Sequence, residues 1–129
     1  MAQQPIELIL VRHLASRLVV PVFVVDAAGD LVYFNEPAEG VLGRRFEEIQ
    51  AMPFEEWTTA FAPASGPRRL AVEELPLVIA LRQRVPAHRR FEITGGDAVK
   101  RSIEVSAFPI TTPPERLIGA VAMFWEVPT

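Results

Sequence analysis

Very few side chains in this sequence have the type and spacing that catalysis requires. Its paired carboxylates are neighbours in the chain, and neighbouring residues on a helix diverge by about 100°, so the two members of a pair cannot act on one substrate atom. Negative charge near a helix N-terminus explains these pairs, which are Glu47-Glu48, Glu55-Glu56 and Glu73-Glu74. Ser102 and Ser106 have no histidine near them in sequence. We therefore expect no enzymatic activity.

Metal and haem chemistry would depend on the two histidines, His13 and His88. Two isolated histidines do not form the ligand cluster that a transition metal needs. Haem usually takes an axial histidine, but His13 falls in an expected surface helix and His88 lies at a strand start beside Arg89 and Arg90. The sequence contains no cysteine, which excludes disulfides and thiolate ligands. We predict no metal site and do not favour haem.

The composition is that of one folded domain. Its 129 residues, half of them apolar, can bury a core without disulfides. The net charge is −3 and no basic stripe is interleaved with aromatics, so we expect no nucleic-acid binding. No apolar run approaches the roughly 20 residues of a membrane span, and Glu7 and Arg12 interrupt the N-terminal apolar stretch. We expect no membrane association and a cytoplasmic location.

The C-terminal part of the chain predicts three consecutive antiparallel strands. Residues 90–94 and 101–107 alternate polar and apolar side chains, as strands with one buried face do. Gly95-Gly96-Asp97 between them is typical of a hairpin turn. Residues 117–127 are apolar almost throughout, which indicates a strand covered on both faces. We expect this last strand in the middle of the sheet.

An amphipathic helix is predicted over residues 6–20, before Pro21. Its apolar face carries leucines at a spacing of four, namely Leu10, Leu14 and Leu18. The apolar run at residues 8–11 is also compatible with a strand. The helix leaves an apolar stripe that needs something to cover it.

Two strands and a series of helices fill the middle of the chain. The expected elements are strands at 22–26 and 31–35, short helical pieces from Pro37, Phe46 and Pro53, a surface loop at 63–67, and a longer helix from Glu73 to about Arg84. Asn35 is expected to cap the first short helix, and Gly43 to end it. The fold class is therefore α+β, with a five-stranded antiparallel sheet, helices on one face and an N-terminal amphipathic helix.

Three segments, in this order and spacing, resemble a PAS domain. Residues 24–35 are similar to the opening hairpin of that family, residues 35–49 to its first helices, and residues 119–127 to its last strand. The Glu74-Leu75-Pro76-Leu77 stretch resembles a subset of bacterial PAS proteins. The resemblance covers essentially the whole chain and implies an N-terminal helix over residues 1–20 followed by a PAS domain over residues 21–129.

The resemblance implies a non-enzymatic sensory or regulatory module for signal transduction. Such domains hold a ligand or cofactor between sheet and helices, or hold none and act as protein–protein interaction modules. They commonly regulate a kinase, phosphatase, cyclase or transcription regulator, so we expect an effector protein as partner. The photoactive flavin adduct and the hydroxycinnamoyl chromophore of this family both need a cysteine, which is absent here. No cofactor is predicted.

Strand alternation assigns the residues that face the helices. The inward set is nearly all hydrocarbon and comprises Phe91, Ile93, Ile103, Val105, Ala122 and Phe124, with Phe124 placed inward by the resemblance. Either these side chains fill a close-packed core, or they line a pocket for a small apolar ligand. Arg101 shares their parity, but its position near the turn predicts that it reaches solvent.

The opposite face of the sheet is expected to carry an apolar patch. Trp125, Met123 and Val121 have outward parity on the last strand, with Phe108 beside them. We expect the N-terminal helix to pack on or beside this face, and the patch to form a homodimer interface together with the stripe of Leu10, Leu14 and Leu18. The alternative is a monomer in which the helix covers the patch completely.

Overall fold

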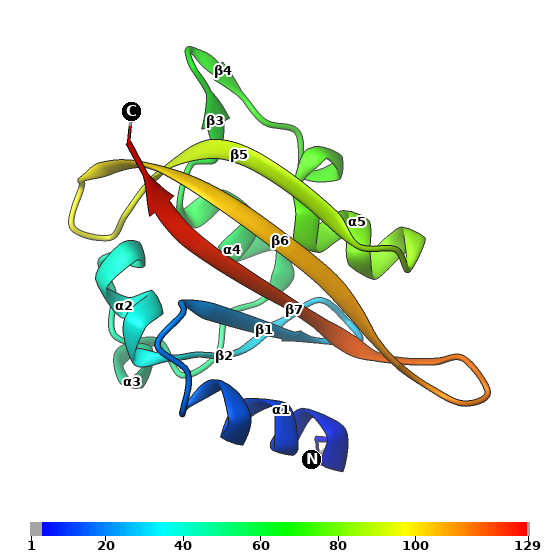
Figure 1. Cartoon of the computed structure of the whole chain (residues 1–129). Helices are drawn as coiled ribbons and strands as arrows, with labels where there is room; N and C mark the ends of the chain where they lie inside the picture. Colours follow the sequence, from blue (N-terminus) through cyan, green and yellow to red (C-terminus); the bar gives the residue numbers. More distant parts are fainter. Residues whose placement is uncertain (1–3, 129) are drawn as a thin grey trace.

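The computed structural model describes residues 4–128, which fold around one antiparallel sheet (Figure 1). The strand order is β2-β1-β7-β6-β5-β3-β4. The long strands are β1 (Val22–Asp26), β2 (Leu31–Phe34), β5 (Ala87–Thr94), β6 (Lys100–Thr112) and β7 (Arg116–Val127). β7 lies between β1 and β6, which confirms the central position that its apolar run predicted.

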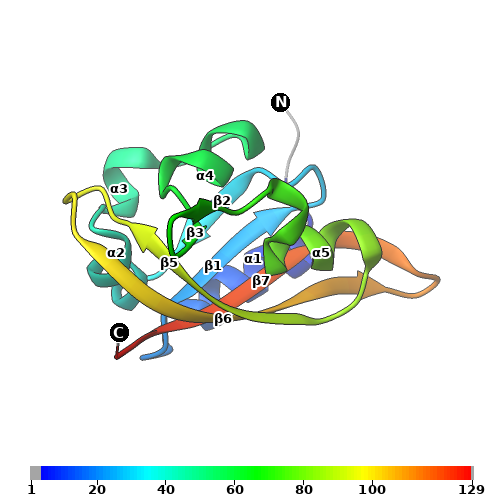
Figure 2. The ribbon, with the colours of Figure 1, turned by 90° about the horizontal axis from the view of Figure 1, so that it is seen from above.

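Most helices pack on one face of the sheet, and α1 packs on the other (Figures 1 and 2). The inner face carries α2 (Glu36–Leu42), α3 (Phe46–Ile49), α4 (Phe54–Ala60), the 3₁₀ turn η1 (Val72–Glu74) and α5 (Pro76–Gln83), while α1 (Ile6–Ala15) lies on the outer face. The predicted α+β architecture is confirmed. No helix among residues 4–128 is long and apolar enough to cross a membrane.

Two details of the chain differ from the sequence prediction. The expected loop at 63–67 contains β3 (Ala64–Ser65), which forms a small hairpin with β4 (Arg68–Arg69) directly after the loop and extends the sheet beyond β5. The helix expected from Glu73 starts as η1 and becomes α-helical only at Pro76. Proline suits the first helical position because its missing N–H would have no partner there.

The sheet separates two hydrophobic cores. The inner core lies under α2, α4 and α5 and includes all six residues that were expected to face inward. The outer core is smaller and lies under α1, where Leu8 and Ala15 pack with Val24, Ile118 and Val121. β1 and β7 contribute side chains to both cores, which explains why neither strand shows polar alternation.

The helix α1 meets the sheet through residues outside the predicted stripe of Leu10, Leu14 and Leu18. Leu8 and Ala15 are buried, whereas Leu10 and Leu14 are each 61% exposed, and that these two leucines form a dimer interface stays a prediction. Positions 8, 11, 15 and 18 also have helical spacing, so the sequence contains two apolar stripes on one helix. Gly119 leaves room for Leu8, because a Cβ at this position would lie 3.2 Å from Leu8 Cδ2.

One buried side chain, Asn35, joins the two sides of the structure. Its Oδ1 accepts hydrogen bonds from the N–H groups of Val22 (2.9 Å) and Ala38 (3.2 Å), the latter capping α2 as predicted. Its Nδ2 donates to the carbonyl oxygens of Ala15 and Val20, each at 2.9 Å. The amide side chain thus accepts two hydrogen bonds and donates two, which is its full capacity. Its partners are backbone groups of α1, the α1–β1 connection, β1 and α2.

We predict that Asn35→Ala lowers the free energy of unfolding by about 3 kcal/mol, because it removes a helix cap and leaves buried backbone groups unpaired. Urea denaturation of wild type and variant measures the change. Asn35→Asp is the matched variant, since it keeps both accepted bonds and loses both donated ones. If Asn35→Asp is as stable as wild type, the bonds to Ala15 and Val20 contribute nothing to the attachment of α1.

Candidate functional site

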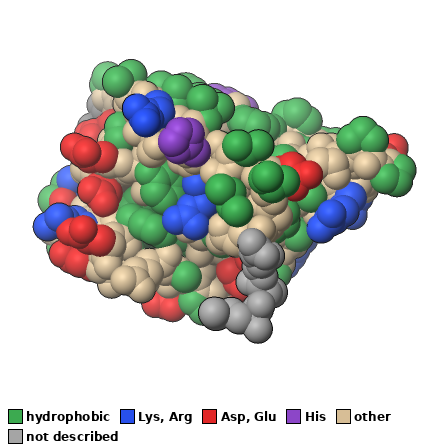
Figure 3. All heavy atoms as spheres, turned by 90° about the horizontal axis from the view of Figure 1, so that it is seen from below, with side chains coloured by type: hydrophobic (Ala, Val, Ile, Leu, Met, Phe, Trp, Pro, Cys, Tyr) green, Lys and Arg blue, Asp and Glu red, His purple; other side chains and the backbone are tan. Residues whose placement is uncertain are grey.

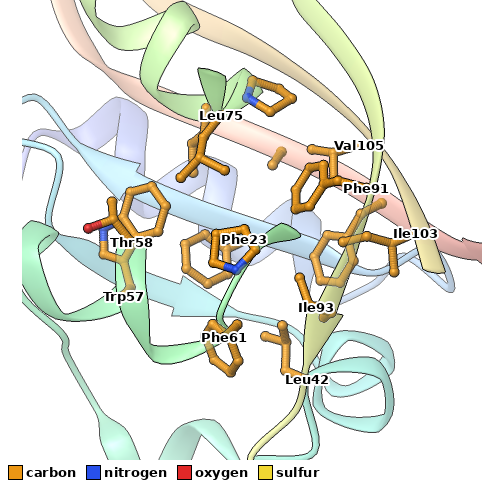
Figure 4. Close-up of a pocket in the computed structure, with 15 residues that line it drawn as sticks. Phe23, Leu42, Trp57, Thr58, Phe61, Leu75, Phe91, Ile93, Ile103 and Val105 are labelled. Atoms are coloured by element: carbon orange, nitrogen blue, oxygen red, sulfur yellow. The ribbon is translucent and has the colours of Figure 1, made fainter. Parts of the chain in front are cut away.

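A cavity of about 80 Å³ lies between the inner face of the sheet and the helices. Figure 4 shows side chains from strands and from helical segments converging on it around Phe23. The fifteen lining residues are all buried: Phe23, Leu42, Trp57, Thr58, Phe61, Pro63, Leu75, Pro76, Leu77, Phe91, Ile93, Ile103, Val105, Ala122 and Phe124.

The strand side of the cavity contains the residues expected from the sequence. Phe91, Ile93, Ile103, Val105, Ala122 and Phe124 all line it. That they bind a ligand stays a prediction. Sequence reasoning missed Phe23, because a strand buried on both faces gives no alternation from which to choose its inward side chains. It also missed the helical side, from Leu42 to Leu77, whose direction depends on how each short helix is placed.

The cavity offers almost nothing for a polar ligand to bond. Its two polar side chains are already engaged within the protein. Trp57 Nε1 donates to the Gly29 carbonyl oxygen at 2.7 Å, and Thr58 Oγ1 donates to the Phe54 carbonyl oxygen at 2.8 Å. A buried polar group without a partner costs roughly 2–7 kcal/mol. The cavity therefore favours an uncharged, apolar occupant.

The size of the cavity restricts that occupant further. Pockets that hold drug-sized molecules measure about 300–1,000 Å³, several times the roughly 80 Å³ found here. In this conformation the cavity suits a molecule of a few heavy atoms. A flavin or a haem would require the helices to move away from the sheet.

A comparison with protein families supports the fold. The model of a family described as PAS fold matches residues 15–128. The chain belongs to the PAS fold family. No curated protein matches the sequence.

Solved PAS structures share the fold at low sequence identity. The PAS domain of Bordetella pertussis BvgS is 16% identical, with a TM-score of 0.63 over 94% of this chain and 85% of its own. The LOV domain of the Erythrobacter litoralis EL346 blue-light activated histidine kinase is 17% identical, with a TM-score of 0.67 over 88% of this chain and 100% of its own. A Rhodobacter sphaeroides LOV protein is 13% identical, with a TM-score of 0.72 over 96% of this chain and 69% of its own.

Two kinds of cofactor site lack their ligands in the part of this PAS domain that the structure describes. The domain has no cysteine, so it cannot form a LOV-type flavin adduct. Residues 4–128 contain no cluster of three or more metal-ligating side chains. His13 lies on α1, across the sheet from the cavity, and the ring of His88 lies 6.1 Å from that of Trp125. Neither histidine lines the cavity.

The outer face of the PAS domain carries exposed apolar side chains (Figure 3). Leu10 and Leu14 are exposed on α1, and Trp125 and Phe108 are each 39% exposed on the sheet. Of the residues predicted to form the dimer interface, Leu10, Leu14 and Trp125 are exposed, whereas Leu18 and Met123 are partly buried against the outer core. Val121 is covered by α1, so the apolar patch on the sheet is smaller than expected.

The prediction that Arg101 reaches solvent is wrong. Only 13% of its side chain is exposed, and it pairs with Asp97 at 2.8 Å and with Glu126 at 3.8 Å. The turn holding Asp97 folds back onto α2, where Gly96 N–H donates to the Leu42 carbonyl oxygen at 2.8 Å. This contact brings Asp97 and Arg101 together and covers the guanidinium. Arg101 is therefore a structural residue beside the cavity rather than an anchor within it.

We predict that Asp97→Asn destabilises the protein at pH 7. Hydrogen bonds from the Arg101 guanidinium and then from the Val99 N–H lower the pKa of Asp97 from 3.8 to about 2. The stabilisation is therefore complete above pH 3.8 and is lost as the pH falls through about 2. Urea midpoints of wild type and variant should differ at pH 7 and converge near pH 2.

Glu47→Gln is the control for this effect. Glu47 pairs with Arg45, but both side chains are mostly exposed, and such pairs contribute little. An Asp97→Asn variant that matches Glu47→Gln at every pH would contradict a role for the Asp97–Arg101 pair.

Proposed function

We propose that this PAS domain is a non-enzymatic sensory module that binds a small apolar molecule in the inner cavity and regulates a separate effector as a homodimer. PAS domains are sensory and signalling modules, and the apolar, buried cavity is the observation that carries the ligand proposal. A ligand acts by shifting the populations of two conformations, so it must bind one of them more tightly. The cavity walls include parts of α2, α4 and α5, so occupancy can favour one arrangement of these helices on the sheet.

The competing proposal is a ligand-free interaction module. The small volume of the cavity supports it, since interiors are close-packed and tolerate a few small voids. In that case regulation depends only on surfaces, chiefly the outer face. The two proposals differ in one measurable property, which is whether a small molecule enters the cavity.

The comparisons suggest the kind of effector. Solved relatives include a PAS domain from a two-component sensor histidine kinase and the LOV domain of a blue-light activated histidine kinase. A histidine kinase is therefore our first candidate for the effector. A phosphatase, a cyclase or a transcription regulator is the alternative.

A homodimer would cover the exposed apolar side chains of the outer face. Four of them, Ile6, Ile9, Leu10 and Leu14, lie on α1, and Trp125 lies on the same face of the sheet. Both surfaces belong to one side of the molecule, which suits a two-fold interface between identical patches. Under this proposal the N-terminal helix, within residues 1–20, has two roles: one face completes the fold of residues 21–129, and the other meets the partner.

The cavity proposal predicts that xenon, which occupies apolar protein cavities, binds the wild-type protein. Ala122→Leu should abolish xenon binding because the added carbons fill the cavity, and it should leave stability unchanged or raise it by about 0.5–2 kcal/mol. NMR shifts of the methyl groups of Ile93 and Ile103 under xenon pressure measure binding, and urea denaturation measures stability.

Ala107→Leu is the matched control for the cavity. Ala107 pairs directly with Ala122 and is buried in the same core, but it does not line the cavity. This variant should keep xenon binding and lose about 1–3 kcal/mol through overpacking. If xenon shifts no lining residue in wild type, the interaction module replaces the sensor.

The dimer proposal predicts that wild type sediments as a dimer at tens of micromolar, and that Leu10→Glu and Trp125→Glu each shift it to monomer. A buried apolar anchor at an interface contributes about 2 kcal/mol or more, roughly a 30-fold change in Kd. Ala60→Glu on α4 is the control, because Ala60 is exposed on the other side of the sheet. A wild-type monomer would refute the proposal. Deleting α1 is a poorer test, since it would uncover Val24 and Val121.

A further inference from the structure

The β3–β4 hairpin projects from one end of the sheet (Figure 1). We call residues 62–70 the flap. Its tip, from Ser65 to Arg69, is exposed throughout, whereas Pro63 and Leu70 at its base are buried. A 3.0 Å hydrogen bond from Leu70 N–H to the Pro63 carbonyl oxygen closes the base. Pro63 also lines the cavity, so the base of the flap forms part of the cavity wall.

Few interactions attach the flap to the sheet. β3 pairs with β5 only at Ala64 and Glu92, one residue pair. An ion pair between Arg68 and Glu74, 3.1 Å long, ties the tip to η1, but the Arg68 side chain is exposed and such pairs contribute little. Within residues 4–128 no donor reaches the buried Oε1 of Glu92, and Lys100 Nζ lies 3.6 Å from it. The side chains near this junction therefore do little to hold the flap closed.

The chain enters the flap through a strained residue. Ala62 has a φ of +45°, in the left-handed region that a residue with a Cβ disfavours. Just before it, Thr94 N–H donates to the Phe61 carbonyl oxygen at 2.8 Å, which fixes the end of α4 to β5. The strained residue thus lies between the end of α4, which is fixed to β5, and the loosely attached flap. Rotation about Ala62 would relieve this strain and displace Pro63, the next residue in the chain, from its place in the cavity wall.

We propose that the flap is the gate through which a small apolar ligand reaches the inner cavity. The proposal rests on the ligand function proposed above. The other parts of the cavity wall are paired strands and the helical segments of α2, α4 and α5, where opening would break several backbone hydrogen bonds or separate packed core residues. Segments that open at low free energy are those with few buried contacts and few protected backbone bonds. The exposed tip of the flap, which joins β5 at one residue pair, is such a segment, and opening the base separates two buried residues, Pro63 and Leu70, from the core.

A disulfide across the single β3–β5 pair tests the gate. The sequence has no cysteine, so Ala64→Cys with Glu92→Cys introduces one bond only. Opposed residues of an antiparallel pair lie about 4.5–5.5 Å apart at Cα, within the range a disulfide spans. We expect the oxidised variant to exchange xenon at least 10-fold more slowly than its reduced form, as measured by ¹²⁹Xe NMR. Equal rates in the two forms would overturn the gate.

His88→Cys with Ser106→Cys is the matched control, because it links the directly opposed residues of β5 and β6 away from the flap. Oxidation of this pair should leave the xenon exchange rate unchanged; a similar slowing would show that stiffening the sheet anywhere closes the cavity, and would overturn the proposal.

Hydrogen exchange of the wild-type Leu70 amide tests flap opening without xenon or a disulfide. We expect it to exchange at least 10-fold faster than the β6 amides, and equal protection would overturn the gate. Absence of xenon binding in every form would refute the ligand function instead, and Leu70 exchange would still report whether the flap opens.

Discussion

The hydrogen bonds of Asn35 join backbone groups from both sides of the sheet at one point. The amide side chain is buried between the two cores and bonds backbone groups of Ala15, Val20, Val22 and Ala38. A buried backbone group without a partner is expensive, so the end of α1, the start of β1 and the start of α2 are all fixed by one residue. The entry angle of α2, which carries Leu42 to the cavity, is set at the same point.

The second constraint is the central position of β1 and β7, which are buried on both faces. Their inward side chains, such as Phe23 and Phe124, belong to the inner core, and their outward side chains, such as Val24 and Val121, need α1 as a cover. The N-terminal helix is therefore part of the fold and also exposes a second apolar face. This arrangement couples the outer surface to the same strands that line the cavity.

The cavity is a consequence of how short helices meet a twisted sheet. Five aromatic side chains line it, from three strands and from α4 and its C-terminal end, namely Phe23, Trp57, Phe61, Phe91 and Phe124. A small apolar void is left where they converge. The polar side chains that line the void are already hydrogen-bonded within the protein. The void therefore selects its occupant mainly by disfavouring polar molecules, which would find no partner there.

The sequence by itself determined the five longer strands, the central place of β7 and the inward residues of β5 and β6, namely Phe91, Ile93, Ile103 and Val105. Alternation and continuous apolar runs follow directly from burial on one or both faces. It also determined the Asn35 cap and the absence of thiol chemistry. Only the tertiary structure decided which stripe of α1 faces the sheet, since Leu8 and Leu10 both lie on stripes of helical spacing and the sequence pattern alone does not choose between them. It likewise decided the helical wall of the cavity and the covered state of Arg101, because both depend on contacts between residues far apart in the chain.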